Sequence, residues 1–256
     1  MPVTDTESRM LLLPTDHPLA VAVVACIHGG DVEELQKLLL AHAGLATARL
    51  GDDDAGGMSR TLLHVVADWP GHFPNGGAIV KLLARAGADV DARFNGPHEE
   101  TPLHWAASCN DVAVLDALLD AGADIEAPGS VLGGGPPLSD ATGFAQWDAA
   151  RRLVQRGART TLADHATLGM MEALEHDFTN EQPTPDEIHR ALWGACHGGQ
   201  RAAAELLLAH GADVNWLPGW ERVTPLDAAR RNGFEDLAQW LGGRGGRSAH
   251  ERGLVG

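Results

Sequence analysis

The sequence predicts an all-α solenoid, in which short helix pairs stack side by side and loops project from one edge. One phrase, TPLHWAA at 101–107, returns as TLLHVVA at 61–67 and as TPLDAA at 224–229. A second phrase, Gly-Ala followed by Asp or Arg, returns at a spacing of 35 residues, twice in succession. Phrases that recur at such a period are typical of chains built from copies of one unit.

Each period reads as two helices followed by a loop. Thr101 can cap the free amides of a first helix, and Pro102 is tolerated in its first turn. Apolar residues at helical spacing over 112–119 predict a second helix, and Gly122 ends it where a left-handed residue is needed. Two short helices cannot bury their apolar faces alone, so we expect copies of the unit to stack.

These phrases resemble the ankyrin repeat, whose unit of about 33 residues opens on Thr-Pro-Leu-His and closes on Gly-Ala-Asp. The stretch TPLHWAAS…LLDAGADIEA is a near-complete match, and TPLDAARRNG and AAAELLLAHGADVN are partial ones. The resemblance is specific for fold and unspecific for function. It implies that His64 and His104 bond to neighbouring loop backbone. The repeat-motif positions are Thr61, His64, Gly87, Thr101, Pro102, His104, Gly122, Gly157, Gly211, Thr224 and Pro225.

The resemblance covers nearly the whole chain. We expect an N-terminal segment at 1–16, an ankyrin repeat domain at 17–242 and a flexible, Gly-rich tail at 243–256. A proline-containing linker at 179–187 leaves the continuity of the array open. The domain is expected to hold about seven units, near 17–45, 61–89, 101–125, 137–159, 160–178, 188–214 and 224–242.

Composition and charge exclude several classes of protein. The apolar fraction is 44%, as in globular proteins, and no run is long enough to span a membrane. A net charge of −16 argues against nucleic acid and anionic membranes as partners. The N-terminus lacks the pattern of a signal peptide, and three dispersed cysteines favour reduced thiols in a cytoplasm. Arg greatly outnumbers Lys, and Ala and Gly are abundant, which indicates a bacterial genome rich in GC. We also expect the protein to be a monomer.

Departures from the repeat pattern predict where a site could lie. An insertion at 70–76 interrupts the second unit, and long connections occupy 43–60 and 127–137. Loops of this size are commonly functional or mobile. The first helices of ankyrin arrays line a concave groove. We place on this groove His28, Asp68, Trp69, Trp105, Ser108, Cys109, Asp140, Phe144, Trp193, His197, Trp216 and Trp220, with Phe94, His98, Glu99 and Glu100 on adjoining loops.

Signals for catalysis or metal binding are weak. No pair of histidines or cysteines has the spacing of a metal site, so we expect no metal and no cofactor. Cys196 and His197 are adjacent on a helix and point about 100° apart, which argues against a nucleophile and its base. The GGGPP stretch at 133–137 lacks the Gly-Lys-Ser/Thr ending of a phosphate loop, and GDDDAGG at 51–57 lacks the calcium-loop pattern.

The groove therefore predicts a cytoplasmic, non-catalytic protein-binding module. Seven tryptophans without a single tyrosine would supply anchors, and the negative charge favours a partner with a basic patch and salt-sensitive association. Two alternatives remain open. His28, Asp68, Asp140 and His197 could enclose a small molecule or perform acid–base chemistry on one, with the insertion as a lid. An immunity or antitoxin role, in which the acidic chain inhibits a basic enzyme, is the other.

Overall fold

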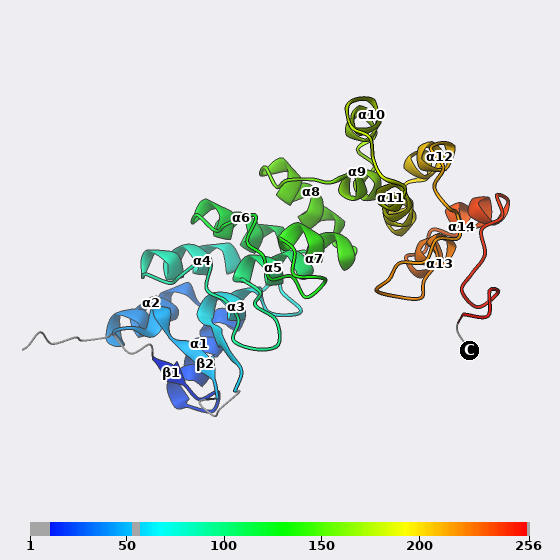
Figure 1. Cartoon of the computed structure of the whole chain (residues 1–256). Helices are drawn as coiled ribbons and strands as arrows, with labels where there is room; N and C mark the ends of the chain where they lie inside the picture. The colour runs from blue at the N-terminus through cyan, green and yellow to red at the C-terminus, as the bar shows by residue number, and fades with distance from the viewer. Residues whose placement is uncertain (1–10, 53–56, 255–256) are drawn as a thin grey trace, which may run out of the picture. The chain divides into compact units, whose positions relative to one another are not determined.

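The computed structural model describes residues 11–52 and 57–254. Most of the N-terminal segment and of the acidic stretch at 51–57 therefore lies outside the described residues. The chain divides into two compact units, Met1–Ala158 and Arg159–Gly256, a division that the sequence does not indicate. Each is a stack of helix pairs (Figure 1).

Helix pairs in the first unit stack in two rows. The first helices of the pairs pack in the order α1, α3, α5 and α7, and the second helices in the order α2, α4, α6 and α8. The all-α solenoid predicted from the sequence is confirmed. The helices are α1 (Pro18–Gly29), α2 (Val32–Ala41), α3 (Leu62–Ala67), α4 (Gly76–Arg85), α5 (Pro102–Ser108), α6 (Val112–Asp120), α7 (Pro137–Gly143) and α8 (Trp147–Gln155).

Threonine and glycine mark the ends of these helices. Thr61 and Thr101 each form a capping box with the histidine three residues later, which pairs backbone donors left free at the start of a helix. Gly122, directly after the C-cap of α6, has φ +96°, a left-handed conformation that glycine adopts without steric cost. The repeated phrases thus specify where helices begin and end.

A small sheet combines a strand from the expected N-terminal segment with two strands from the end of the long connection before α3. Strand β2 (Arg49–Gly51) pairs parallel with β1 (Leu12–Leu13) and antiparallel with β3 (Ser59–Thr61). A 3-10 helix, η1 (Leu45–Thr47), leads into β2. The buried Arg49 guanidinium donates to the Ser59 hydroxyl and carbonyl at 2.9 and 2.7 Å and to the Arg93 carbonyl at 2.7 Å. These contacts join the sheet to the loop before α5.

Helices of the second unit form a shorter stack. Helices α9, α11 and α13 pack in one row, and α10 packs on α12. The linker at 179–187 therefore does not interrupt the stacking within this unit. Its core consists of small and branched side chains such as Ala191, Leu192 and Leu207. The helices are α9 (Leu162–Leu168), α10 (Met171–Asn180), α11 (Pro185–His197), α12 (Arg201–Ala209), α13 (Pro225–Arg231) and α14 (Glu235–Gly242).

The segment after α14 differs from the flexible tail that we expect from its composition. The Asn215 side chain donates to the Gly245 carbonyl at 2.9 Å and accepts from the Arg247 amide at 2.8 Å. The Ala249 amide donates to the Asp227 carboxylate at 2.7 Å, and the Ala249 side chain is buried. Hydrogen bonds between its backbone and the Asn215 and Asp227 side chains thus attach this glycine-rich segment to the loop after α12 and to α13. Across the described part of the chain, no helix combines the length and the apolar character needed to cross a bilayer.

Candidate functional site

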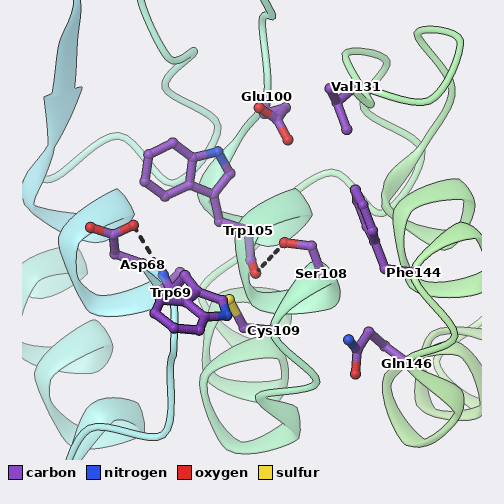
Figure 2. Close-up of a pocket in the computed structure, with 10 residues that line it drawn as sticks. Asp68, Trp69, Glu100, Trp105, Ser108, Cys109, Val131, Phe144 and Gln146 are labelled. Carbon is purple, nitrogen blue, oxygen red and sulfur yellow. Dashed lines mark hydrogen bonds between the residues drawn. The ribbon is translucent and has the colours of Figure 1, made fainter.

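An open cavity of about 430 Å³ lies in the first unit, at the carboxyl ends of α3, α5 and α7 (Figure 2). Six residues that we place on the groove from the sequence line it: Asp68, Trp69, Trp105, Ser108, Cys109 and Phe144. The expected loop residue Glu100 also lines it, and sequence reasoning did not single out Ala67, Val131 and Gln146.

Aromatic side chains form the walls of this cavity. Helix α3 ends at Ala67, and the extended backbone of Asp68 directs Trp69 outward, where 81% of it is exposed. Trp105 lies half-buried on α5 and contacts Phe94 at a ring-centroid distance of 5.4 Å. Phe144, 44% exposed, and Val131 stand across the cavity from Trp105 in Figure 2. Two indoles and a phenyl ring thus face solvent around one hollow.

Two carboxylates adjoin these rings. Asp68 pairs with Arg60 and accepts a hydrogen bond from the Trp69 amide at 3.0 Å. Burial raises the pKa of Glu100, and a hydrogen bond from Trp105 partly opposes the shift. In Figure 2 the indole nitrogen of Trp105 points toward the Glu100 carboxyl group. Since Arg60 already balances Asp68, Glu100 is the carboxyl group of the cavity with the least charge compensation.

The insertion at 70–76 is attached to both neighbouring repeats. The His72 amide donates to the Asp111 carboxylate at 2.7 Å, on the side of α6. On the other side, Phe73 stacks on His28 at 4.2 Å, and the Asn75 side chain donates to the Gly30 carbonyl at 2.9 Å. These contacts attach the insertion to the repeats on either side of it.

His28 does not line the cavity, in contrast to its place in the expected groove. It lies under Phe73, where its Nε2 atom is buried and has no hydrogen-bond partner among the described residues. Burial lowers its pKa, because the charged imidazolium loses solvation there. The aromatic insertion therefore covers a residue that the repeat alone would leave facing the groove.

Asp140 also departs from the expected groove, since it is fully buried. Its Oδ1 atom accepts a hydrogen bond from the Ser130 hydroxyl at 2.6 Å, and its Oδ2 atom has no partner in the part of the chain that the structure describes. Burial raises the pKa of Asp140 to about 7. The long connection at 127–137 folds over this side chain, so the residue supports that loop and is not available to a ligand.

Four other expected groove residues belong to the second unit. Trp193 stacks on His197 at 5.1 Å and meets Trp220 edge to face at 5.7 Å, and Trp216 meets Trp220 at 5.8 Å. His197 is buried, and its Nδ1 atom and carbonyl oxygen lie 2.8 and 2.7 Å from the Asn232 side-chain nitrogen. These residues form a cluster of their own in the second unit.

His64 and His104 lie inside the first unit, next to the loops of the following repeats. The Nε2 atom of His64 is 3.1 Å from the Glu100 carbonyl oxygen, and that of His104 is 3.2 Å from the Gly135 carbonyl oxygen. Burial lowers the pKa of His64 to about 3 and that of His104 to about 4. Both imidazoles are therefore neutral at physiological pH and connect a helix start to a loop. In the described residues, no three His, Cys, Asp or Glu side chains gather as a metal site would require.

The stacked helix pairs, with threonine at their starts and left-handed glycine at their ends, define a helical repeat protein. The family model for ankyrin repeats (3 copies) matches residues 19–129 and 74–164, more than half of the chain. The chain belongs to the ankyrin repeat family. The number of seven units stays a prediction.

Two nematode proteins are similar to this chain. An ankyrin repeat and KH domain-containing protein of Caenorhabditis briggsae is 32% identical over 183 residues, which are 67% of this chain and 7% of the relative. A protein of the same description from Caenorhabditis elegans is 27% identical over 177 residues, 69% of this chain and 6% of the relative. The chain thus spans a small part of the relatives it matches, and their origin does not support the bacterial source expected from composition.

Proposed function

We propose that this protein is a non-catalytic binding module whose cavity in the first unit receives a basic segment of a partner protein. Ankyrin repeats are protein-interaction modules. The observation that carries the proposal is the exposed Trp69 indole beside Trp105, Phe144 and the Glu100 carboxyl group. Tryptophan is among the residues that contribute most to binding energy at interfaces.

The chemistry of the cavity favours a cationic side chain with an apolar stem. A guanidinium or ammonium group is attracted to the face of an indole. It is also attracted to a carboxylate whose negative charge is little balanced by nearby cations. The stem of such a side chain would cover the aromatic walls. The net charge of −16 adds a long-range attraction for a basic partner, which salt screens.

Acid–base catalysis, the alternative considered from the sequence, has less support. It needs a carboxyl group and an imidazole that both reach one substrate. Asp140 is buried beneath its loop, His28 is covered by Phe73, and neither lines the cavity. The exposure of Trp69 and Phe144 describes an open hollow, which suits a protein segment better than an enclosed small molecule.

A fluorescent peptide of alternating arginine and leucine tests the proposal by anisotropy. Trp69→Ala is expected to weaken binding about tenfold or more, since it removes an exposed anchor. Glu100→Gln is expected to weaken binding and to reduce its salt dependence. Leu40→Ala is the matched control, because Leu40 is also 81% exposed but lies on α2, away from the cavity. Equal affinity of Trp69→Ala and Leu40→Ala would refute the proposed site.

A further inference from the structure

We propose that the second unit carries a separate binding surface, specific for an acidic segment of a partner protein. The surface consists of Trp193, Trp216, Trp220, Arg190 and Arg231, and we call it the tryptophan–arginine surface. Arg190 and Trp193 lie on α11, Trp216 and Trp220 on the loop that follows α12, and Arg231 on α13. It does not depend on the cavity proposed above.

The rings of this surface are stacked against cations. The Arg190 guanidinium lies 4.9 Å from the centroid of Trp220, and the Arg231 guanidinium lies 5.6 Å from that of Trp193. The side chain of Trp220 is 53% exposed and Arg190 is exposed as well. A guanidinium held over an indole keeps its N–H edge available, so it can donate two parallel hydrogen bonds to a carboxylate.

The loop that presents Trp216 and Trp220 is attached at both ends. The Asp213 amide donates to the His189 ring at 3.2 Å, and the Trp193 indole N–H donates to the Val223 carbonyl at 2.9 Å. Edge-to-face contacts join Trp220 to both other indoles. A surface ordered before binding loses little conformational entropy when a partner docks.

Arg190 and Arg231 differ in how their charge is balanced. Arg231 pairs with Glu221 at 2.8 Å. Within the described residues, Arg190 forms no ion pair with a carboxylate. The contrasting case is Arg201, which lies 5.2 Å from the ring of Trp240 but also pairs with Glu205 at 3.1 Å. Arg190 is therefore the arginine of the surface that can accept a new carboxylate without breaking an existing ion pair.

The charge around this surface differs from that of the whole chain. From the start of α11, residues 185–254 contain eight arginines and nine acidic residues, whereas the chain as a whole carries a charge of −16. Of these acids, Asp227 accepts from the Thr224 and Ala249 amides, and Glu221 is paired with Arg231. An acidic segment can therefore approach with less repulsion here than elsewhere on the chain. Glutamate or aspartate next to an apolar residue would meet Arg190 and Trp220 together.

Two-dimensional NMR of the indole N–H groups tests this surface on the full chain. The probe is a short peptide of alternating glutamate and leucine, with the arginine–leucine peptide as the second arm. We expect the acidic peptide to shift the Trp216 and Trp220 signals and to leave those of Trp69 and Trp105 in place. Arg190→Gln and Trp220→Ala are each expected to weaken its binding about tenfold.

Arg201→Gln is the matched control, since it also removes an arginine from an indole face but spares the surface, and it should bind as the wild type does. The proposal is overturned if the acidic peptide shifts no indole of the second unit, if it shifts Trp69 instead, or if Arg190→Gln and Arg201→Gln bind it equally. If the arginine–leucine peptide does not bind but the acidic peptide does, the proposed site in the first unit is contradicted and the tryptophan–arginine surface is not. Unchanged backbone spectra of the variants show that the fold is retained.

Discussion

Ser130 donates a hydrogen bond of 2.6 Å to Asp140, a carboxyl group with no exposed surface and one unpartnered oxygen. Ser130 also accepts from the Leu132 amide at 3.0 Å, so the pair holds the connection that carries Val131 into the cavity. The stability of this loop thus depends on the protonation of a residue inside the repeat.

Asp140 makes the stability of the first unit depend on pH. Its pKa is raised from 3.8 to about 7, so the folded state binds a proton that the unfolded state has released between these values. The stabilisation of the folded state by this proton is present in full below the pKa of Asp140 in the unfolded chain. It is lost as pH rises through the pKa of Asp140 in the folded chain. It corresponds to about 4 kcal/mol at most.

Asp140→Asn removes this titration. Relative to the wild type, the unfolding free energy of the variant should increase as pH rises from about 4 to about 7 and then level off, as measured by chemical denaturation. Glu33→Gln, which changes an exposed carboxylate on α2, is the control. A constant difference between Asp140→Asn and the wild type across this range would contradict the assignment.

The histidines of the two capping boxes should occupy one tautomer. The Thr61 and Thr101 amides donate to Nδ1 of His64 and His104 at 3.3 and 3.1 Å, so Nε2 must carry the proton that the loop carbonyl accepts. NMR of the ring nitrogens should show the Nε2–H form for both, without titration between pH 5 and 8. Because their pKa values are lowered, their contribution to stability is present above pH 6.5 and is lost as pH falls toward 4 and 3. Detection of the Nδ1–H form would contradict these bonds.

Asp111 has two roles where its counterpart in the first repeat has one. Asp111 accepts from the Val114 amide at 3.1 Å as the cap of α6 and from the His72 amide of the insertion. Among the described residues, the Asp31 carboxylate accepts from the Glu34 amide alone, at 2.9 Å, as the cap of α2. We expect Asp31→Ala to cost about 1 kcal/mol of unfolding free energy and Asp111→Ala about 2 to 3 kcal/mol. Equal losses in urea denaturation would show that the insertion adds no stability through this residue.

Gly30 tests how closely the insertion contacts α1. Its φ of +71° is left-handed, and a Cβ atom there would lie 2.5 Å from the Pro74 carbonyl oxygen. Gly87 has a similar φ of +95° with open space around it. Gly87→Ala should therefore report backbone strain alone, about 1 kcal/mol, and Gly30→Ala should cost clearly more. Similar losses from the two variants would indicate that Pro74 moves away without cost.

The sequence predicts the helices well and the tertiary neighbours of the loops poorly. Helix ends follow from local chemistry at Thr101 and Gly122, so the repeated phrases suffice to predict them. The strands are two or three residues long, which is too short for an alternating pattern. Arginine is mostly exposed in proteins, yet the Ser59 and Arg93 carbonyl oxygens make the burial of Arg49 possible.

The structure brings some of the residues expected on the groove together and separates others, for a related reason. Helix position alone places Trp69, Trp105 and Phe144 at the same edge, and the cavity brings them together. Whether a loop covers a residue depends on long-range contacts, such as Phe73 on His28 and Ser130 on Asp140. The repeat period in the sequence also does not indicate that the chain divides into two compact units after Ala158.

The most direct test of the binding account is an NMR titration of the full chain with the arginine–leucine peptide, read at the indole N–H signals of Trp69 and Trp105. The account predicts saturable shifts of both signals, weakened by salt and by Glu100→Gln, while the signal of Trp240 stays in place. Uniform small shifts of all indoles, or no shift at Trp69 and Trp105 with the protein folded, would contradict it.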